Sequence, residues 1–158
     1  MANLMFNIAK IEVSDDGTTW QDLGATQGGG RITQDVQEVE IQSDQNADPE
    51  AIISIRAPKT ISVNLLDASL ENLALAFGGT VSGNVVSIPN IVSGVEKQVK
   101  ITTQPVNGVS FEILVQRGKI TGRSEINLNA DGAATIPLEI KVLAPQSGDS
   151  VTITKSSS

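Results

Sequence analysis

From Ala51 to Leu66 the chain alternates apolar and polar side chains, and this alternation limits its possible folds more than any other segment does. A period of two residues is typical of a β-strand that buries one face and leaves the other in water, as in an antiparallel sheet. Pro58 interrupts the run, and because proline lacks a backbone N–H it marks a break, a bulge or an edge position. The apolar parity comprises Ala51, Ile53, Ile55, Ala57, Ile61, Val63 and Leu65, whereas the polar parity comprises Ser54, Arg56, Thr60, Ser62 and Asn64.

Short segments of the same kind recur along the rest of the chain and are separated by turn residues. Asp16-Gly17 is one such turn signal, since Asp-Gly supplies the positive φ angles of a tight hairpin. Regularly spaced short strands with glycine-containing turns predict a mainly β fold, an antiparallel β-sandwich or half-open barrel. We expect a single domain over 1–158, with a frayed tail at 155–158. The expected further strands are 8–13, 18–23, 85–88, 95–103, 109–116, 119–128, 135–143 and 150–154.

One short α-helix is predicted at about residues 69–77. Asp67 or Ser69 can cap its N-terminus, and Gly78 or Gly79 can end it in the left-handed conformation. A helix of this length is marginal on its own, so we expect it to pack against the sheet. Its apolar stripe comprises Leu66, Leu70, Leu73 and Phe77, with Ala74 beside them.

A glycine triplet, 28–30, precedes a polar and acidic strand, 31–41. We interpret the triplet as a bent connector and not as a phosphate-binding loop, because neither a Lys-Ser/Thr pair nor a helix follows it. Ile32 and Val36, early in the strand, point to one face, whereas Val39 and Ile41, later in the strand, point to the other. An extra residue near Gln37-Glu38 would bring all four to one face, so we expect a β-bulge there. The four residues are Ile32, Val36, Val39 and Ile41.

Between this strand and the alternating run lies an extended loop, 43–50, which is rich in Asp, Asn and Gln. Its acidic residues raise the alternative of a calcium site, but the loop lacks the central glycine and the terminal bidentate Glu of an EF-hand. We therefore predict no metal and interpret the segment as a docking loop for another protein subunit. The docking candidates are Asp44, Gln45, Asn46, Asp48 and Pro49.

The composition argues against several function classes. The chain has no histidine and no cysteine, so the commonest general base, the thiol nucleophile and the usual zinc ligands are missing. A formal net charge of −7 argues against a protein that grips nucleic-acid phosphates. Glu38 and Glu40 lie two apart on one strand face, and we interpret them as a solvated polar face in preference to a catalytic pair. We therefore predict no enzyme activity and no cofactor.

The cellular setting follows from similar observations. The absence of cysteine and of a visible secretion signal favours folding in a reducing cytoplasm. No apolar run approaches the roughly 20 residues that cross a bilayer, so we expect no membrane anchor.

A hairpin, an acidic strand, an Asp-Gln loop, a long alternating strand and one Leu-rich helix ending in Gly-Gly follow one another before residue 79. This order resembles that of the tail tube (major tail) proteins of tailed bacteriophages, and the recognisable motifs lie in residues 20–79. The residues that carry the resemblance are Trp20-Gln21-Asp22-Leu23-Gly24, Gly28-Gly29, Val39-Glu40-Ile41, Asp44-Gln45, Pro49 and the run from Leu65 to Gly79.

The resemblance implies a structural virion protein of the tail that is assembled in the cytoplasm of a host bacterium. It implies that six copies form a ring, that inner strands join into a barrel, and that rings stack into a tube for delivering double-stranded DNA. Tape measure, tail terminator and distal tail proteins are further partners that it implies. A hydrophilic, net acidic channel wall would let DNA slide without tight binding. The lumen-lining candidates are Glu38, Glu40, Ser54, Thr60, Ser62 and Asn64.

Other functions stay open at this point. An Hcp-like subunit of a secretion tube would share the implied architecture. A monomeric β-sandwich binding or adhesion module would often present aromatic side chains to its ligand, and three Phe, one Trp and no Tyr disfavour that function. A carboxylate-based hydrolase rests only on the abundance of Asp and Glu.

Overall fold

The computed structural model describes residues 4–128 and 132–157. Within these ranges the chain forms one short helix and three sheets, and every strand pair is antiparallel. In chain order the elements are β1 (Ile8–Ser14), β2 (Gln21–Asp22), β3 (Thr26–Gln34), β4 (Gln37–Ile41), β5 (Ala51–Arg56), β6 (Lys59–Leu65), α1 (Leu70–Phe77), β7 (Thr80–Ser82), β8 (Val85–Ser87), β9 (Val95–Thr103), β10 (Val109–Ile120), β11 (Ile136–Val142) and β12 (Val151–Ser157).

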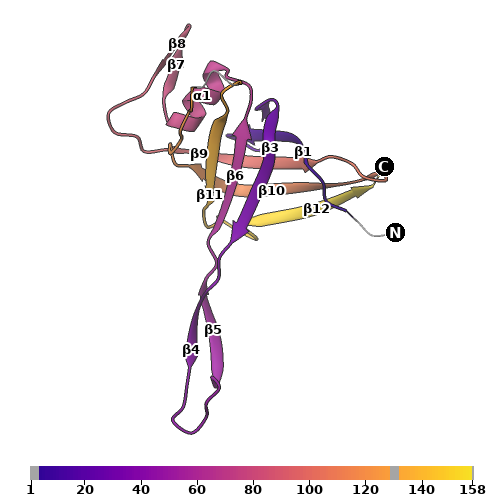
Figure 1. Ribbon diagram of the computed structural model, residues 1–158, viewed down its shortest axis with the longest axis vertical. Coiled ribbons are helices and arrows are strands. Elements are labelled where there is room, and N and C mark those ends of the chain that lie inside the picture. The colour runs from indigo at the N-terminus through magenta and orange to yellow at the C-terminus, as the bar shows by residue number, and fades with distance from the viewer. Residues whose placement is uncertain (1–3, 129–131, 158) are drawn as a thin grey trace.

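The largest sheet has eight strands, seven of them in the order β2–β1–β9–β10–β11–β6–β3. The eighth, β12, pairs with the first half of β10, while β11 pairs with the end of β10. In Figure 1, β3, β6 and β11 run steeply across β1, β9, β10 and β12, so the sheet bends over on itself. This arrangement confirms the predicted antiparallel half-open barrel, with the core inside the bend.

The core is built from the apolar parity of the strands. On β6, Ile61, Val63 and Leu65 are almost fully buried, as the alternation predicted. Ile61 stands opposite Ile140 of β11 in the sheet register, and both side chains face inward. Burying one such side chain contributes about 1.5–3 kcal/mol relative to leaving it exposed. The inward-facing parity of β6 and β11 therefore holds the steep half of the sheet against the other half.

Helix α1 confirms the predicted element and its caps. The Ser69 hydroxyl oxygen accepts a hydrogen bond from the backbone N–H of Asn72 at 3.2 Å, and Gly78 ends the helix with a φ of 74°. The buried face, however, is centred on Asn72, Leu75 and Ala76. The residues of the predicted stripe, Leu66, Leu70, Leu73 and Phe77, are only partly buried, and Ala74 alone among the expected group is buried.

Asn72 explains why the helix is rotated relative to the predicted stripe. Its amide nitrogen donates hydrogen bonds to the backbone oxygens of Leu23, at 2.8 Å, and Asp67, at 2.9 Å. A buried amide with two partners is no longer costly, so a polar residue can lie on the packing face of the helix. The bond to Leu23 ties α1 to the segment that follows β2.

Two predicted strands, 109–116 and 119–128, are wrong in their limits. Strand β10 runs without interruption through Gly118 to Ile120, and residues 121–128 form no strand. A Cβ atom on Gly118 would lie 2.7 Å from Cγ2 of Ile140, so glycine is required there by close packing between β10 and its neighbour. The register of β10 against β9 also shifts at this point.

The glycine triplet lies inside β3 and is not the predicted connector. The register against β6 shifts between Thr26 and Gly30, which places a bulge at the triplet. A Cβ atom on Gly30 would lie 2.6 Å from Cδ1 of Ile8. Glycine therefore lets the start of β1 cross β3 at close range.

The end of the chain also differs from the prediction. Strand β12 continues through Lys155 to Ser157, where a frayed tail was expected, and Ser158 lies outside the described residues. Lys155 stands opposite Phe111 of β10, and the ladder extends as far as Val109. Pairing with a long neighbouring strand supplies the backbone hydrogen bonds that keep this segment extended.

Candidate self-assembly surfaces

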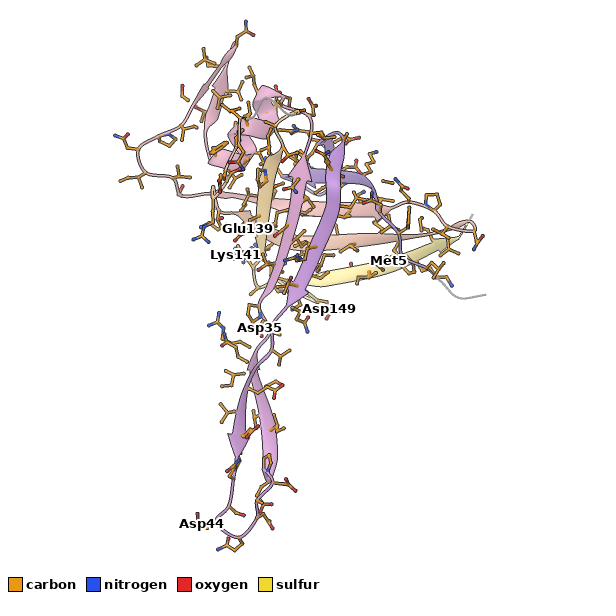
Figure 2. All side chains as sticks on the ribbon, in the orientation of Figure 1. Met5, Asp35, Asp44, Glu139, Lys141 and Asp149 are labelled. Atoms are coloured by element: carbon orange, nitrogen blue, oxygen red, sulfur yellow. The ribbon has the colours of Figure 1, made fainter. Side chains whose placement is uncertain are left out.

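The part of the protein that projects furthest is the two-stranded ribbon β4–β5, which we call the arm (residues 37–56). Figure 2 shows it leaving the rest of the molecule, with Asp35 at its root and Asp44 at its tip. At the root, the backbone N–H of Asp35 donates to the oxygen of Pro58 at 3.0 Å. Pro58 is thus the predicted break, and it separates β5 and β6 into two different sheets.

The arm has one apolar and one acidic face. In the register of β4 against β5, Val39 stands opposite Ile53, and Ile41 stands opposite Ala51. Directly opposed residues share a face, so these four side chains form an apolar face. The other face carries Glu38 opposite Ser54, and Glu40 opposite Ile52.

An irregularity occurs at Gln37-Glu38, where the sequence predicted a β-bulge. Gln37 pairs with Arg56 while Glu38 pairs with Ser54, so the unpaired extra residue is Ile55 on β5. The prediction had placed the extra residue on the acidic strand itself. That strand is also not continuous, because it ends as β3 at Gln34 and resumes as β4 at Gln37.

The arm leaves an unusual amount of apolar surface in water. Val39 and Ile41 are 45% and 46% exposed, and Ile53 and Ile55 are 51% and 61% exposed. An isolated two-stranded ribbon is marginally stable, and contiguous exposed apolar side chains mark interaction surfaces. Covering the remainder of one such side chain would contribute about 1 kcal/mol. The exposed apolar side chains of the arm therefore indicate a binding surface for another protein chain.

Hydrogen bonds shape the loop at the tip of the arm. The Glu50 carboxylate accepts from the Ser43 hydroxyl at 2.7 Å and from the Asn46 amide at 2.6 Å. These two bonds, the one from Ser43 first, hold the pKa of Glu50 below its usual range. The backbone N–H of Glu50 also donates to the Ile41 oxygen at 2.7 Å. The predicted docking loop is thus a closed hairpin end and carries the candidates Asp44, Gln45, Asn46, Asp48 and Pro49, which are all exposed.

A second polar surface covers the outer face of β3, β6 and β11, and we call it the wall. One row across the three strands is Arg31, Ser62 and Glu139. The next row is Thr33, Thr60 and Lys141. Neighbouring strands lie about 4.8 Å apart, so Arg31 and Glu139 face each other across β6 at about 10 Å. The wall therefore carries separated charges of both signs.

The structure divides the predicted lumen-lining residues between these two surfaces. Thr60, Ser62 and Asn64 lie on the wall, where the buried parity of β6 faces the core. Glu38, Glu40 and Ser54 share the acidic face of the arm. The predicted acidic character belongs to the arm, which holds five acidic residues and one arginine, a net charge of −4 out of −7. On the wall, Arg31 and Lys141 stand beside the single acid Glu139.

Sequence reasoning missed two components of these surfaces. The charged residues Arg31, Glu139 and Lys141 join the wall only through the pairing of distant strands, which no local pattern reports. The apolar face of the arm was visible as an alternation, but alternation was interpreted as a buried face. The sequence did contain one signal of an exposed ribbon. Acidic residues and branched apolar residues are mixed in the strands that flank the loop 43–50, which is unusual for strands of a buried core.

Charged groups elsewhere stabilise local structure. The Asp16 carboxylate accepts hydrogen bonds from the backbone N–H groups of Thr19 and Thr18, which lower its pKa. The Arg117 guanidinium donates to Glu96 at 2.6 Å, which lowers the pKa of Glu96 and raises that of Arg117. Exposed ion pairs of this kind contribute little to stability. In the described ranges, no group of three His, Cys, Asp or Glu side chains is placed to hold a metal ion.

A separate finding concerns membranes. Over residues 4–128 and 132–157, no helix has the length and apolar character needed to cross a bilayer.

Comparison with known proteins bears on these surfaces. A family model described as "Phage tail tube protein" matches residues 7–155, which is nearly the whole chain. Comparison with curated proteins finds no match.

Two solved structures are similar to this chain in fold. The first is from the virion of a native gene transfer agent particle, with a TM-score of 0.52 and 14% identity, covering 91% of this chain and 95% of that one. The second is from the tail of an empty gene transfer agent particle, obtained by helical refinement with C6 symmetry. Its TM-score is 0.54 at 14% identity, and it covers 92% of this chain and 94% of that one. At this identity the likeness concerns the fold alone.

Proposed function

The chain belongs to the phage tail tube protein family, and from this membership and the two polar surfaces we propose that six copies form a ring and that rings stack into a channel for double-stranded DNA. Its role is that of a structural tail tube subunit, a component of the particle tail. The C6 symmetry of the similar gene transfer agent tail supports the ring size. Assembly in the cytoplasm of a host bacterium is part of the same proposal.

The observation that carries the proposal is the two-faced arm. Its apolar face, Val39, Ile41, Ala51 and Ile53, is covered by no element of its own chain within the described residues. A second copy is the partner that a self-assembling family supplies. An arm that always docks on the next copy makes a head-to-tail contact, and a contact of this kind builds a filament unless its rotation closes a ring.

The acidic face of the arm and the wall are proposed to line the channel. When the apolar face packs on protein, Glu38 and Glu40 turn away from that contact. Carboxylates repel DNA phosphates, and the wall offers only separated cations, so DNA passes without being held. This role supplies a reason for an acidic ribbon in a protein that works beside DNA.

The proposal includes no catalysis and no cofactor. Partners other than a second copy and passing DNA are those that the family resemblance implies, namely the tape measure, tail terminator and distal tail proteins. Each of these would meet the ends or the interior of the assembled tube.

Removal of the arm tests the assembly. Replacing residues 37–56 by Asn-Gly, which favours a tight hairpin turn, should leave a folded subunit, because the arm contributes nothing to the core. Electron microscopy of the concentrated variant should show no tubes or stacked rings, whereas the unaltered protein should form them. A strictly monomeric unaltered protein at every concentration would refute the proposed function.

The channel role has its own test. The double variant Glu38→Lys and Glu40→Lys should still form tubes, because both side chains lie opposite the apolar face of the arm. DNA release from particles that carry it should slow, and more so at low salt, since added cations hold phosphates electrostatically. Unchanged release would remove these two residues from the channel.

A further inference from the structure

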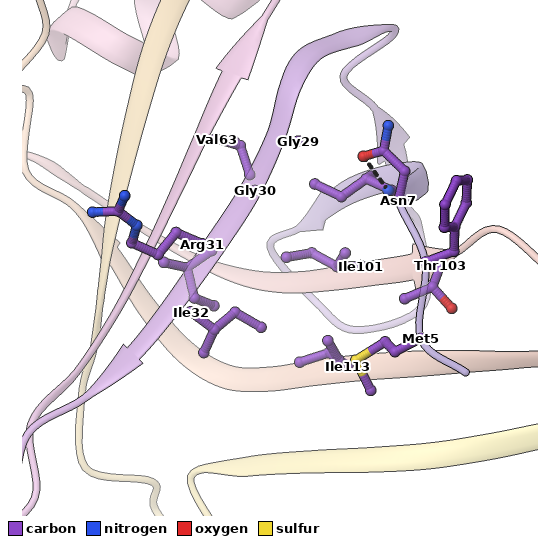
Figure 3. Close-up of a pocket in the computed structure, with 13 residues that line it drawn as sticks. Met5, Asn7, Gly29, Gly30, Arg31, Ile32, Val63, Ile101, Thr103 and Ile113 are labelled. Carbon is purple, nitrogen blue, oxygen red and sulfur yellow. Dashed lines mark hydrogen bonds between the residues drawn. The ribbon is translucent and has the colours of Figure 1, made fainter. Parts of the chain in front are cut away.

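An apolar cleft of about 310 Å³ opens where the bent sheet fails to close, lined by β3 and β6 on one side, by β9 and β10 on the other, and by the N-terminal segment at one end. Figure 3 shows Ile113 and Ile101 on its floor, Ile32 on one side, and Met5 at the end where the N-terminal segment crosses. The rim side chains are accessible, since Ile32 is 47% exposed and Phe6 is 66% exposed. Through the cleft, side chains of the hydrophobic core are therefore accessible from the surface.

The two strands beside this opening each have a free edge. Within the described residues, β3 pairs only with β6, and β12 pairs only with β10. Ile153 of β12 stands opposite Ile113, so it extends the apolar floor and is itself 59% exposed. Unpaired edges of this length are templates for another strand. The opening therefore suits an extended, apolar and strand-like occupant.

We propose that the arm of a second copy seats its apolar face in this cleft, with Ile53 and Val39 directed at Ile32 and Ile113. This deepens the proposed function, on which it rests, by naming the surface that receives the arm. The occupant and the cleft match in form, since each strand of the arm has a free edge that can meet β3 or β12. They match in chemistry, since branched aliphatic side chains meet branched aliphatic side chains.

The charges of the arm are compatible with this pairing. Glu38 and Glu40 lie on the face opposite Val39 and Ile53, so both carboxylates stay outside the contact when the apolar face is seated in the cleft. The desolvation of these two charges therefore does not oppose the docking.

The arm of the same chain does not supply this contact. Its root is fixed by the bond from the Asp35 N–H to the Pro58 oxygen, and Figure 1 shows the ribbon extending away from β12 and the N-terminal segment. The hairpin β7–β8 is a weaker occupant, because its strands are only three residues long. A contact from the arm of one copy to the cleft of another leaves the second arm free for a third copy.

Engineered cysteines test this contact. The chain contains no native cysteine, so a thiol cross-linker can react only with the introduced side chains. Subunits carrying Ile53→Cys are mixed with subunits carrying Ile32→Cys, assembled, and treated with a short bis-maleimide. We expect a cross-linked dimer of the two variants in tubes and none in dispersed subunits. Ile52→Cys is the matched control, since Ile52 is similarly exposed but lies on the acidic face of the same arm. It should give only background cross-linking with Ile32→Cys.

The outcomes separate this inference from the proposed function. If tubes form and Ile53→Cys fails to link to Ile32→Cys, or links instead to Val85→Cys at the β7–β8 hairpin, the docking site is wrong while the tube function stands. Equal cross-linking by Ile52→Cys would also overturn the orientation. A second pair, Ile41→Cys with Met5→Cys, covers the case in which the first pair does not assemble. Absence of tubes from the unaltered protein would remove both proposals.

Discussion

Strands β5 and β6 carry one continuous alternation of apolar and polar residues, yet they have opposite surroundings. On β6 the apolar parity, Ile61, Val63 and Leu65, is 0–3% exposed, whereas Ile53 and Ile55 of β5 are more than half exposed. Two residues, Ala57 and Pro58, separate a strand of the core from a strand of the arm. A period of two residues therefore predicts that the apolar face of a strand will be buried. It does not predict whether that face packs against the same chain or against another one.

The strongest test of this contrast replaces one apolar residue on each strand. Leu65→Ala should lower the free energy of unfolding of the subunit by about 2–5 kcal/mol, because it leaves a cavity in a closed core. Ile53→Ala should leave that free energy within about 0.5 kcal/mol of the original, as for a surface substitution. Urea unfolding of dispersed subunits measures both. A large loss in Ile53→Ala would mean that the arm folds back onto its own chain.

A smaller effect is expected where the helix joins the body. Asn72→Ala removes the amide that bonds the Leu23 and Asp67 oxygens and leaves both acceptors without this partner. The free energy of unfolding should fall by about 1–3 kcal/mol. Ser69→Ala, which removes only the helix cap, should cost about 1 kcal/mol. An equal or larger loss from Ser69→Ala would contradict a structural role for the buried amide.

Ile53→Ala should affect the assembly of tubes and not the folding of the subunit. Ile53→Ala deletes part of a side chain that becomes covered only between copies, which weakens the contact by about 1 kcal/mol. The concentration needed to form tubes should rise about fivefold, since 1.4 kcal/mol corresponds to a factor of ten. Sedimentation of tubes at increasing protein concentration measures this shift. Ile52→Ala, on the acidic face, should change it much less, and equal shifts would contradict the two-faced arm.

Local signals in the sequence predicted local structure well. The caps at Ser69 and Gly78 and the break at Pro58 are confirmed, because each depends on neighbouring residues alone. The irregularity expected at Gln37-Glu38 is present, but its extra residue is Ile55 on the partner strand and not a residue of the acidic strand. The same parity rule correctly put Glu38 and Glu40 on one face.

Features that depend on distant partners were not predictable. Gly118 is required by Ile140, which lies on another strand, so a glycine that suggested a turn between two strands lies inside one continuous strand, β10. The charges of the wall come together only when β3 and β11 flank β6. The roles of the wall and the docking loop remain predictions, since both depend on further copies of the chain.

The smallest expected effect concerns the tip of the arm, where Glu50 closes the loop. Its pKa is lowered when the loop is closed, because the Ser43 hydroxyl and the Asn46 amide bond the charged carboxylate. A carboxyl group with a lowered pKa stabilises the closed form fully above its ordinary pKa of 4.5, and this stabilisation is lost as the pH falls through the lowered pKa. The loop should therefore be unaffected between about pH 7 and 5 and should open only in stronger acid.

An NMR titration of the Glu50 carboxyl resonance measures that pKa directly. Ser43→Ala should move it back toward the ordinary value, since the Ser43 bond is the largest cause of the shift. Glu50→Gln should abolish the acid-dependent change in exchange of the residue 50 amide, which donates to the Ile41 oxygen. The core amides of β6 should exchange at unchanged rates in both variants, because the root at Asp35 and Pro58 separates the arm from the core. If a change at the tip did alter exchange in β6, the arm and the core would unfold as one cooperative unit. Strands β5 and β6 would then differ in solvent exposure but not in stability.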